Sequence, residues 1–164
     1  MRVPILLWLS LAMSCLADPS PPPLTFLYAV NLTFNGAGTL NIGQTAMGRR
    51  VAYPISGGSF SGPMMSGVAL YGLDWGLNDN RGVFREDTIY YLYTNDSAII
   101  MVRAIGIGPN VHHTFETSAA KYMWLNNVVA YAGSRYVAGA VGLDVWQVCF
   151  SSPYPWARAA RLRL

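Results

Sequence analysis

Apolar and polar residues alternate along the first part of the chain. From residue 24 to residue 34 every even position is apolar, whereas Thr25, Asn31 and Thr33 occupy odd positions. A period of two is typical of a strand with one buried face. We therefore predict a half-buried strand over residues 24–34, with Asn31 and Thr33 on its solvent side.

Glycine-containing breaks divide the rest of the chain into short apolar runs. The runs hold roughly 5 to 11 residues, rich in Val, Ile, Tyr and Thr, which favours strands. The breaks include Gly57-Gly58, Gly62-Pro63 and the segments 79–82 and 106–109. This pattern predicts an all-β sandwich or barrel in a single domain.

Two local signals add detail to this pattern. Asn95-Asp96 is a turn sequence, and it predicts a hairpin between strands at residues 90–93 and 99–105. Ser118 is a candidate N-cap for one short helix that runs toward Leu125.

The ends of the chain differ from this pattern. Residues 1–17 begin with Arg2 and continue with an apolar run, which predicts a cleaved signal peptide rather than a membrane anchor, because the run is shorter than a bilayer span. Residues 18–23 read as a proline-rich leader, residues 24–150 as the barrel domain and residues 151–164 as a loose basic tail. We expect a secreted or lumenal protein without a stable membrane anchor.

Secretion affects how the cysteines and the sequons are interpreted. Removal of the signal removes Cys15 and leaves Cys149, which is either a buried inert thiol or a link to a second copy in a homo-oligomer. Asn31 and Asn95 each begin a glycosylation sequon, so both are candidate glycan sites.

The charge balance bears on possible partners. The formal charge is +3, but Arg2 and three arginines lie in the terminal segments, and seven basic residues then remain against eight acidic ones. A nucleic-acid surface needs many cations on one face, so we expect no nucleic-acid partner. The glycines also lack the strand, turn and helix context of nucleotide-binding motifs, so no cofactor is expected.

Asp74 is the first candidate for chemistry. It lies in an apolar segment that starts at Val68, and strict alternation puts it on the side of Val68 and Leu70. A buried carboxyl group needs a partner or a raised pKa. Asp74 is therefore either a general acid or base in a pocket, or a structural residue paired with an arginine or capping the bend at Gly76.

Arg103 and the two histidines are further candidates. Arg103 is the one charge in the apolar strand 99–105 and requires a carboxylate, a ligand anion or water at the barrel mouth, with Asp74 and Asp87 as candidate carboxylate partners. The pair would be either a fold-fixing ion pair or half of a polar site. His112 and His113 point to opposite faces of a strand, so His113 is either a proton shuttle or a solvated loop residue. No metal site is expected, because further His or Cys ligands are missing.

Short glycine, arginine and tryptophan motifs give the chain a family resemblance. They include Gly48-Arg49-Arg50, Gly57-Gly58-Ser59-Phe60-Ser61-Gly62-Pro63, Asp74-Trp75, Arg103, Phe115-Glu116-Thr117 and Trp124-Leu125-Asn126. With these motifs the chain resembles the domain-of-unknown-function 3237 family over about residues 24–148. The resemblance implies a small calycin-like or lipocalin-like β-barrel, single and antiparallel, of about 8–10 short strands with one short helix. The family has no settled activity.

The chain also departs from the family pattern. Ser97 stands where members often have Gly, Ile89 where they often have Arg, and Ala104 where they tend to have Asn. A polar network typical of the family would be thinner in this protein.

These observations favour a barrel that binds a small apolar or aromatic molecule and that could catalyse a cofactor-free cyclisation, isomerisation or lyase step. Asp74, Arg103 and His113 are the expected catalytic residues. Arg49, Phe60, Trp75 and Trp124 are the expected ligand-binding residues. The alternatives are a non-catalytic carrier or extracellular interaction protein, or a structural surface glycoprotein. An open cavity that reaches Asp74 would favour the first interpretation.

Overall fold

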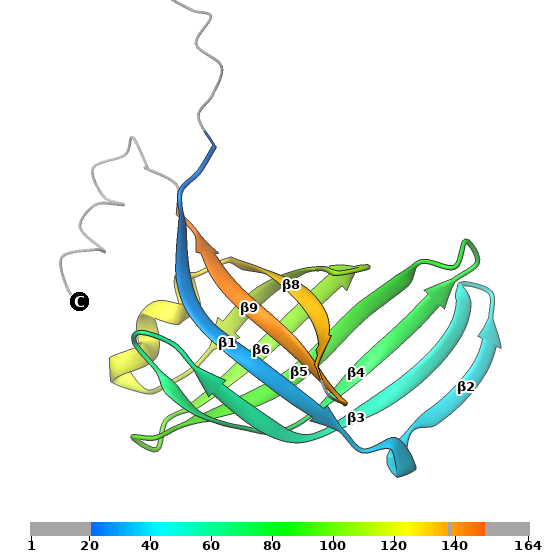
Figure 1. Cartoon of the computed structure of the whole chain (residues 1–164), viewed down its shortest axis with the longest axis horizontal. Helices are drawn as coiled ribbons and strands as arrows, with labels where there is room; N and C mark the ends of the chain where they lie inside the picture. Colours follow the sequence, from blue (N-terminus) through cyan, green and yellow to red (C-terminus); the bar gives the residue numbers. More distant parts are fainter. Residues whose placement is uncertain (1–20, 138, 150–164) are drawn as a thin grey trace, which may run out of the picture.

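The structure, a computed structural model, describes residues 21–137 and 139–149, and these form a β-barrel (Figure 1). The predicted signal peptide, Cys15 and the basic tail lie outside the described residues. The strands are β1 (Leu24–Phe34), β2 (Leu40–Thr45), β3 (Gly48–Ser61), β4 (Ser66–Asp79), β5 (Phe84–Thr94), β6 (Ile99–Ile107), β7 (Asn110–Glu116), β8 (Ala130–Val137) and β9 (Ala140–Val148). Two 3₁₀ segments are η1 (Gly36–Gly38) and η2 (Ala120–Asn127).

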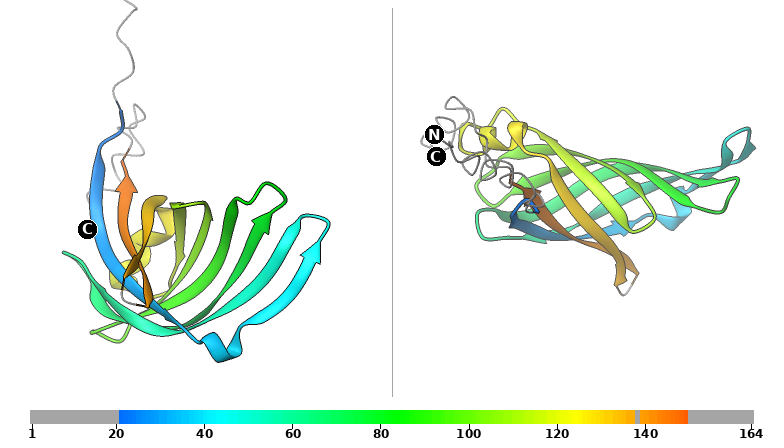
Figure 2. Two further views of the ribbon diagram at one scale, coloured as in Figure 1. Left: turned by 45° about the vertical axis from the view of Figure 1, so that its right-hand side comes forward. Right: turned by 90° about the horizontal axis from the view of Figure 1, so that it is seen from above.

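Eight of these strands close into an antiparallel ring. The order is β1-β9-β8-β7-β6-β5-β4-β3, and β1 also pairs with β3, which closes the barrel. β2 pairs with the first part of β3 and extends the sheet outside the ring. Figure 2 shows the β2–β3 and β4–β5 turns projecting beyond the other strands. The predicted all-β antiparallel barrel with one short helix is confirmed.

The strand predicted over residues 24–34 has the bounds of β1. Tyr28, Val30 and Leu32 are buried, whereas Asn31 and Thr33 are exposed. A bulge between Phe26 and Tyr28 breaks the alternation at one point. The hairpin predicted at Asn95-Asp96 is also confirmed, between β5 and β6.

Two details of the prediction were wrong. Ser118 is not the N-cap of the helix, because η2 starts at Ala120 and its preceding residue, Ala119, makes no side-chain cap. Gly57-Gly58 does not break a strand but lies within the 14-residue β3. Gly58 lies opposite Leu32 of β1, where a Cβ would overlap the Asn31 carbonyl oxygen. This glycine therefore allows two strands to approach closely.

The barrel has a packed end and an open end. η2 joins β7 to β8 and buries Tyr122 and Leu125 against the core, which closes one end. The β6–β7 and β8–β9 turns lie at the other end of these strands. No helix among residues 21–137 and 139–149 is long and apolar enough to cross a bilayer.

Candidate functional site

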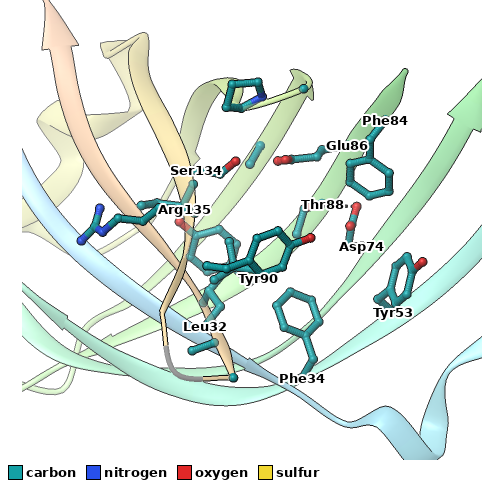
Figure 3. Close-up of a pocket in the computed structure, with 18 residues that line it drawn as sticks. Leu32, Phe34, Tyr53, Asp74, Phe84, Glu86, Thr88, Tyr90, Ser134 and Arg135 are labelled. Atoms are coloured by element: carbon teal, nitrogen blue, oxygen red, sulfur yellow. Dashed lines mark hydrogen bonds between the residues drawn. The ribbon is translucent and has the colours of Figure 1, made fainter. Parts of the chain in front are cut away.

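A cavity of about 590 Å³ opens at the end of the barrel opposite η2 (Figure 3). Its wall comes from β1, β3, β4, β5, β6, β8 and β9 and from two turns. Most of the lining side chains are apolar or aromatic. The lining residues are Leu32, Phe34, Tyr53, Asp74, Phe84, Glu86, Thr88, Tyr90, Ala104, Gly108, Pro109, Ser134, Arg135, Tyr136, Gly139, Ala140, Val141 and Leu143.

Two carboxyl groups face this cavity from neighbouring strands. Asp74 lies on β4 and Glu86 on β5, and Figure 3 shows both side chains directed into the cavity. Thr88 is the cross-strand partner of Asp74, and its hydroxyl donates to Asp74 Oδ1 at 2.9 Å. The backbone N–H of Asp87 donates to the same oxygen at 3.3 Å. Asp74 Oδ2 accepts no hydrogen bond from the described residues, so it is free to bind a ligand proton.

A β-bulge in β4 turns Asp74 inward. Ala69 pairs with Leu92, but Gly72 already pairs with Tyr90, so the register shifts within this segment. Val68 is therefore 46% exposed while Asp74 is 6% exposed. The prediction that Asp74 and Val68 share a face was wrong, although Asp74 does face the interior, because a bulge reverses the alternation.

The two carboxyl groups differ in environment, and this affects the pKa of each one. Burial raises the pKa of Asp74, while the hydrogen bonds from Thr88 and Asp87 and the charge of Arg50 oppose this rise. Burial, followed by the negative charge of Asp74, raises the pKa of Glu86 to about 7, and an interaction with the Ser134 hydroxyl opposes it. Near neutral pH, Glu86 therefore carries a proton in a large part of the molecules, a suitable state for a general acid.

Aromatic rings form the wall beside the carboxyl groups. Tyr53 and Phe84 meet edge to face, with ring centroids 6.5 Å apart. Gly76 lies against both rings, since a Cβ there would come within 2.8 Å of each. Leu32 and Leu143 contribute aliphatic surface. The cavity therefore suits an apolar or aromatic ligand with a polar edge.

Arg103 and Arg49 lie away from this cavity. Arg103 is on the outer face of β6, where its guanidinium pairs with Asp87 at 3.3 Å and both side chains are about half exposed. Of its two predicted partners, the structure selects Asp87. Arg49 is exposed on the part of β3 that pairs with β2. The arginine whose charge acts on Asp74 is Arg50, which donates to the Trp75 carbonyl at 2.7 Å.

The three aromatic residues predicted to bind a ligand do not line the cavity. Trp75 is 46% exposed on the outer face. Phe60 packs in the core against Tyr28, at a centroid distance of 5.8 Å, and Trp124 packs against the core from η2. Phe34, Tyr53 and Phe84 take the expected place of these rings.

His113 lies on β7, not in a solvated loop. It is fully buried, and neither ring nitrogen has a hydrogen-bond partner in the described residues. Burial lowers its pKa to about 4. His112 is on the opposite face of the strand and half-buried, as the alternation predicted.

The sequons and Cys149 lie away from the cavity. Asn31 and Asn95 are both exposed, and the Asn95 amide donates to Ser66 Oγ at 3.0 Å. Their glycosylation stays a prediction. Cys149 is half-buried just beyond β9, with its sulfur 3.5 Å from Thr25 Oγ1. In the described part of the chain, no three His, Cys, Asp or Glu side chains gather in a way that could hold a metal ion.

Sequence reasoning missed Glu86, Tyr53 and Phe34. A signal for Glu86 was present, because Phe84, Glu86, Thr88 and Tyr90 alternate with outward residues and all line the cavity. The adjacent charges Arg85 and Asp87 obscured this alternation.

Comparison with known proteins adds a family and an enzyme. The model of the family described as "Protein of unknown function (DUF3237)" matches residues 22–111. The chain is 32% identical over 130 residues to the hydroalkoxylation enzyme phnH of Penicillium herquei. The aligned region covers 79% of this chain and 86% of that protein. It is 27% identical to a UPF0311 protein of Bradyrhizobium diazoefficiens, over 77% of this chain and 98% of that one.

Solved structures have the same fold. A crystal structure of an enzyme from Penicillium herquei superimposes with a TM-score of 0.74 and 31% identity, over 81% of this chain and 98% of that one. A β-barrel-like protein of Acinetobacter baumannii gives a TM-score of 0.72 and 28% identity, over 80% of this chain and 100% of that one.

Proposed function

This chain belongs to the DUF3237 family, and we propose that it is an enzyme that adds the O–H bond of a hydroxyl group across a carbon–carbon double bond of an apolar, aromatic substrate, with an ether as the product. The observation that carries the proposal is the pair of carboxyl groups, Asp74 and Glu86, that face one cavity in different environments. The name of the Penicillium herquei relative, a hydroalkoxylation enzyme, supports this reaction class.

The two carboxyl groups have complementary roles in this reaction. The ionised Asp74 accepts the proton of the attacking hydroxyl on Oδ2, while its Oδ1 is held by Thr88 and the Asp87 N–H. Protonated Glu86 donates a proton to one alkene carbon, and the hydroxyl oxygen bonds to the other. The O–H bond and the π bond are lost, and C–O and C–H bonds form. A proton returns from Asp74 to Glu86 through water at the open mouth of the barrel.

The aromatic wall stabilises the charge that develops during this step. Protonation of an alkene makes the neighbouring carbon electron-poor, and ring faces attract positive charge. Tyr53 and Phe84 stand on the strands that carry the catalytic carboxyl groups or pair with them. A preorganised wall of this kind favours the transition state over the substrate.

The cavity also has the size and surface of a substrate site. Ligand pockets usually hold about 300–1,000 Å³, and they are mostly apolar with a few convergent polar groups. The volume of about 590 Å³ fits this range. A substrate whose hydroxyl and alkene belong to one molecule would cyclise without any change of mass.

The test uses a panel of ortho-alkenylphenols, with 2-allylphenol as the simplest member, and detects cyclised products of unchanged mass by liquid chromatography, mass spectrometry and NMR. We expect kcat/KM to fall by about 10²- to 10⁴-fold in Asp74→Asn and in Glu86→Gln, the usual contribution of a general acid or base. Activity should also decline as pH rises above about 7, because Glu86 then loses its proton.

Glu116→Gln is the matched control, since Glu116 is exposed at the η2 end of β7. It should keep its turnover within twofold. Full turnover by Asp74→Asn would contradict the catalytic mechanism. Tight binding of the panel without turnover of any member would instead identify a non-catalytic carrier.

A further inference from the structure

Three polar side chains are buried together in the barrel interior. Tyr28 of β1, Tyr90 of β5 and His113 of β7 are each fully inaccessible to solvent. The Tyr28 and Tyr90 hydroxyl oxygens lie 3.2 Å apart in a hydrogen bond. The His113 ring meets the Tyr90 ring edge to face, with centroids 6.4 Å apart, and stacks against Phe115. The cluster thus joins three strands inside an otherwise apolar core.

These groups make fewer hydrogen bonds than they can. Two hydroxyl groups and a neutral imidazole offer three donors and several acceptors. Among the described residues the only hydrogen bond is the one between Tyr28 and Tyr90, and both nitrogens of His113 lack partners. One hydroxyl proton, the imidazole N–H and the imidazole acceptor nitrogen therefore have no partner. Buried polar groups rarely lack hydrogen-bond partners, so we expect a polar ligand group to bind at this cluster.

The cluster lies directly behind the inner wall of the cavity. Tyr90 lines the cavity and also belongs to the cluster. Ala104 lines the cavity too, and it is the cross-strand partner of His113. Its side chain is a single methyl group, so the lining residue next to His113 leaves more room beside the imidazole than a larger side chain would.

The cluster is neutral near pH 7. Burial raises the pKa of Tyr28 and of Tyr90, and it lowers the pKa of His113 to about 4. Phe60, Phe115 and Ala104 are among the groups that lie next to the cluster, and none of these carries charge. His112, on the opposite face of β7, also acts to lower the pKa of His113. A charged guest would be poorly compensated here.

We propose that Tyr28, Tyr90 and His113 form an inner subsite that binds the oxygen of a neutral, oxygenated aromatic ligand held in the cavity. A hydroxyl group fits the cluster best, because it can donate to the free imidazole nitrogen and accept from a free hydroxyl or N–H. The inference relies on the proposed function only in placing the ligand in the same cavity. The substrate would then carry a second polar group, which binds at this subsite and is distinct from the groups that react at Asp74 and Glu86.

The test compares two probes of matched shape, 2-naphthol and 2-methylnaphthalene, by fluorescence titration of the full barrel. The measured quantity is the ratio of the two dissociation constants, which cancels the general affinity of the cavity for a naphthalene ring. Removing one hydrogen-bonding partner should lower the preference for 2-naphthol roughly tenfold. We expect this loss in Tyr90→Phe and in His113→Leu, with the affinity for 2-methylnaphthalene nearly unchanged.

His112→Leu is the matched control, because His112 occupies the other face of the same strand. Its ratio should stay within twofold of the wild type. In ¹⁵N-labelled wild-type protein, 2-naphthol should shift the imidazole resonances of His113, whereas 2-methylnaphthalene should not. This second measurement needs no variant and so does not depend on variant folding.

Two results would overturn the inference. One is a ratio that stays within twofold in both Tyr90→Phe and His113→Leu, together with unshifted His113 resonances, since the cluster would then hold only water. The other is the absence of binding of either probe, which would also remove the ligand cavity on which the proposed function depends. A third combination separates the two proposals. If turnover requires Asp74 and Glu86 but the dissociation constants show no preference for 2-naphthol, the subsite is rejected and the proposed reaction is retained.

Discussion

Asp74 and Glu86 share one cavity, but the sequence pointed to only one of them. Asp74 stood out as an acid inside an apolar segment, and such an acid must be compensated wherever it is buried. Glu86 lies between Arg85 and Asp87, and a run of three charges usually indicates a solvated surface. The only local sign that Glu86 faces inward was its alternation with Thr88 and Tyr90, and the two flanking charges outweighed that sign.

A substitution at Glu86 should raise the stability of the protein at high pH although it lowers the activity. The folded protein raises the pKa of Glu86 from 4.5 to about 7, so folding favours the protonated form. This contribution is complete below the ordinary pKa and is lost as pH rises through about 7. Glu86 is partly solvent-exposed, so at pH 8 its ionised form should cost about 1 kcal/mol after allowance for solvent screening.

Glu86→Gln removes this ionisation. At pH 8 the variant should therefore be more stable than the wild type, with a Tm about 3 °C higher, and the difference should nearly vanish at pH 4.5. Calorimetric melting at the two pH values measures it. A variant less stable than the wild type at pH 8 would show that Glu86 makes favourable contacts in its ionised form.

At the level of single strands, β4 shows that alternation alone does not always predict the face to which a side chain points. Its alternation reverses between Ala69 and Gly72, because the partner strand β5 lacks the extra residue. The sequence of β4 alone gives no sign of this register shift, so Val68 was assigned to the wrong face. β1 behaves differently, since its alternation holds over most of its length and its bounds were predicted correctly.

Gly76 in the same strand should control the shape of the cavity. A methyl group at this position would come within 2.8 Å of the Tyr53 and Phe84 rings and force them to move. We expect Gly76→Ala to weaken binding of 2-methylnaphthalene about tenfold and to lower the free energy of unfolding by about 1–2 kcal/mol. Fluorescence titration and urea unfolding measure the two effects.

Gly133→Ala provides the comparison for this experiment. Gly133 also lies within a strand, but a Cβ there meets no atom within 4 Å. Gly133→Ala should change neither the affinity for 2-methylnaphthalene nor the free energy of unfolding appreciably. Equal effects of the two substitutions would mean that strand glycines act through the flexibility of the unfolded chain rather than through the rings.

For the molecule as a whole, the seam between β1 and β3 completes the barrel. The glycines at positions 58 and 62 were predicted to mark breaks between strands, whereas in the structure they let the backbones of β1 and β3 meet. The barrel class could still be predicted, because the many short strand-forming runs and the family motifs both indicated it. The cavity could not, because it is formed by side chains from seven strands, and the face to which each side chain points depends on three register shifts and on the closure.

Gly62→Ala should weaken this closure. A Cβ at position 62 would overlap the Leu27 carbonyl oxygen and approach the Tyr28 Cα to 2.8 Å. Because both contacts are with backbone atoms, they cannot be relieved by a side-chain rotation, and we expect a loss of roughly 2–3 kcal/mol in the free energy of unfolding. Denaturant titration measures this loss. Gly36→Ala, at an open position in η1, should be nearly neutral, and a Gly62→Ala variant as stable as the wild type would show that the seam adapts.

The pairing of β1 with β9 has a consequence for biosynthesis. Leu24 pairs with Val148, so the first described strand of the barrel has its neighbour in the last described strand. During translation, one edge of β1 therefore stays unpaired until β9 has left the ribosome. Contacts this distant in sequence also slow folding, because a long loop must close before they form. The barrel is thus expected to close only after β9 has been synthesised, and until then the exposed edge of β1 is the part of the nascent chain that most needs protection from pairing with other chains.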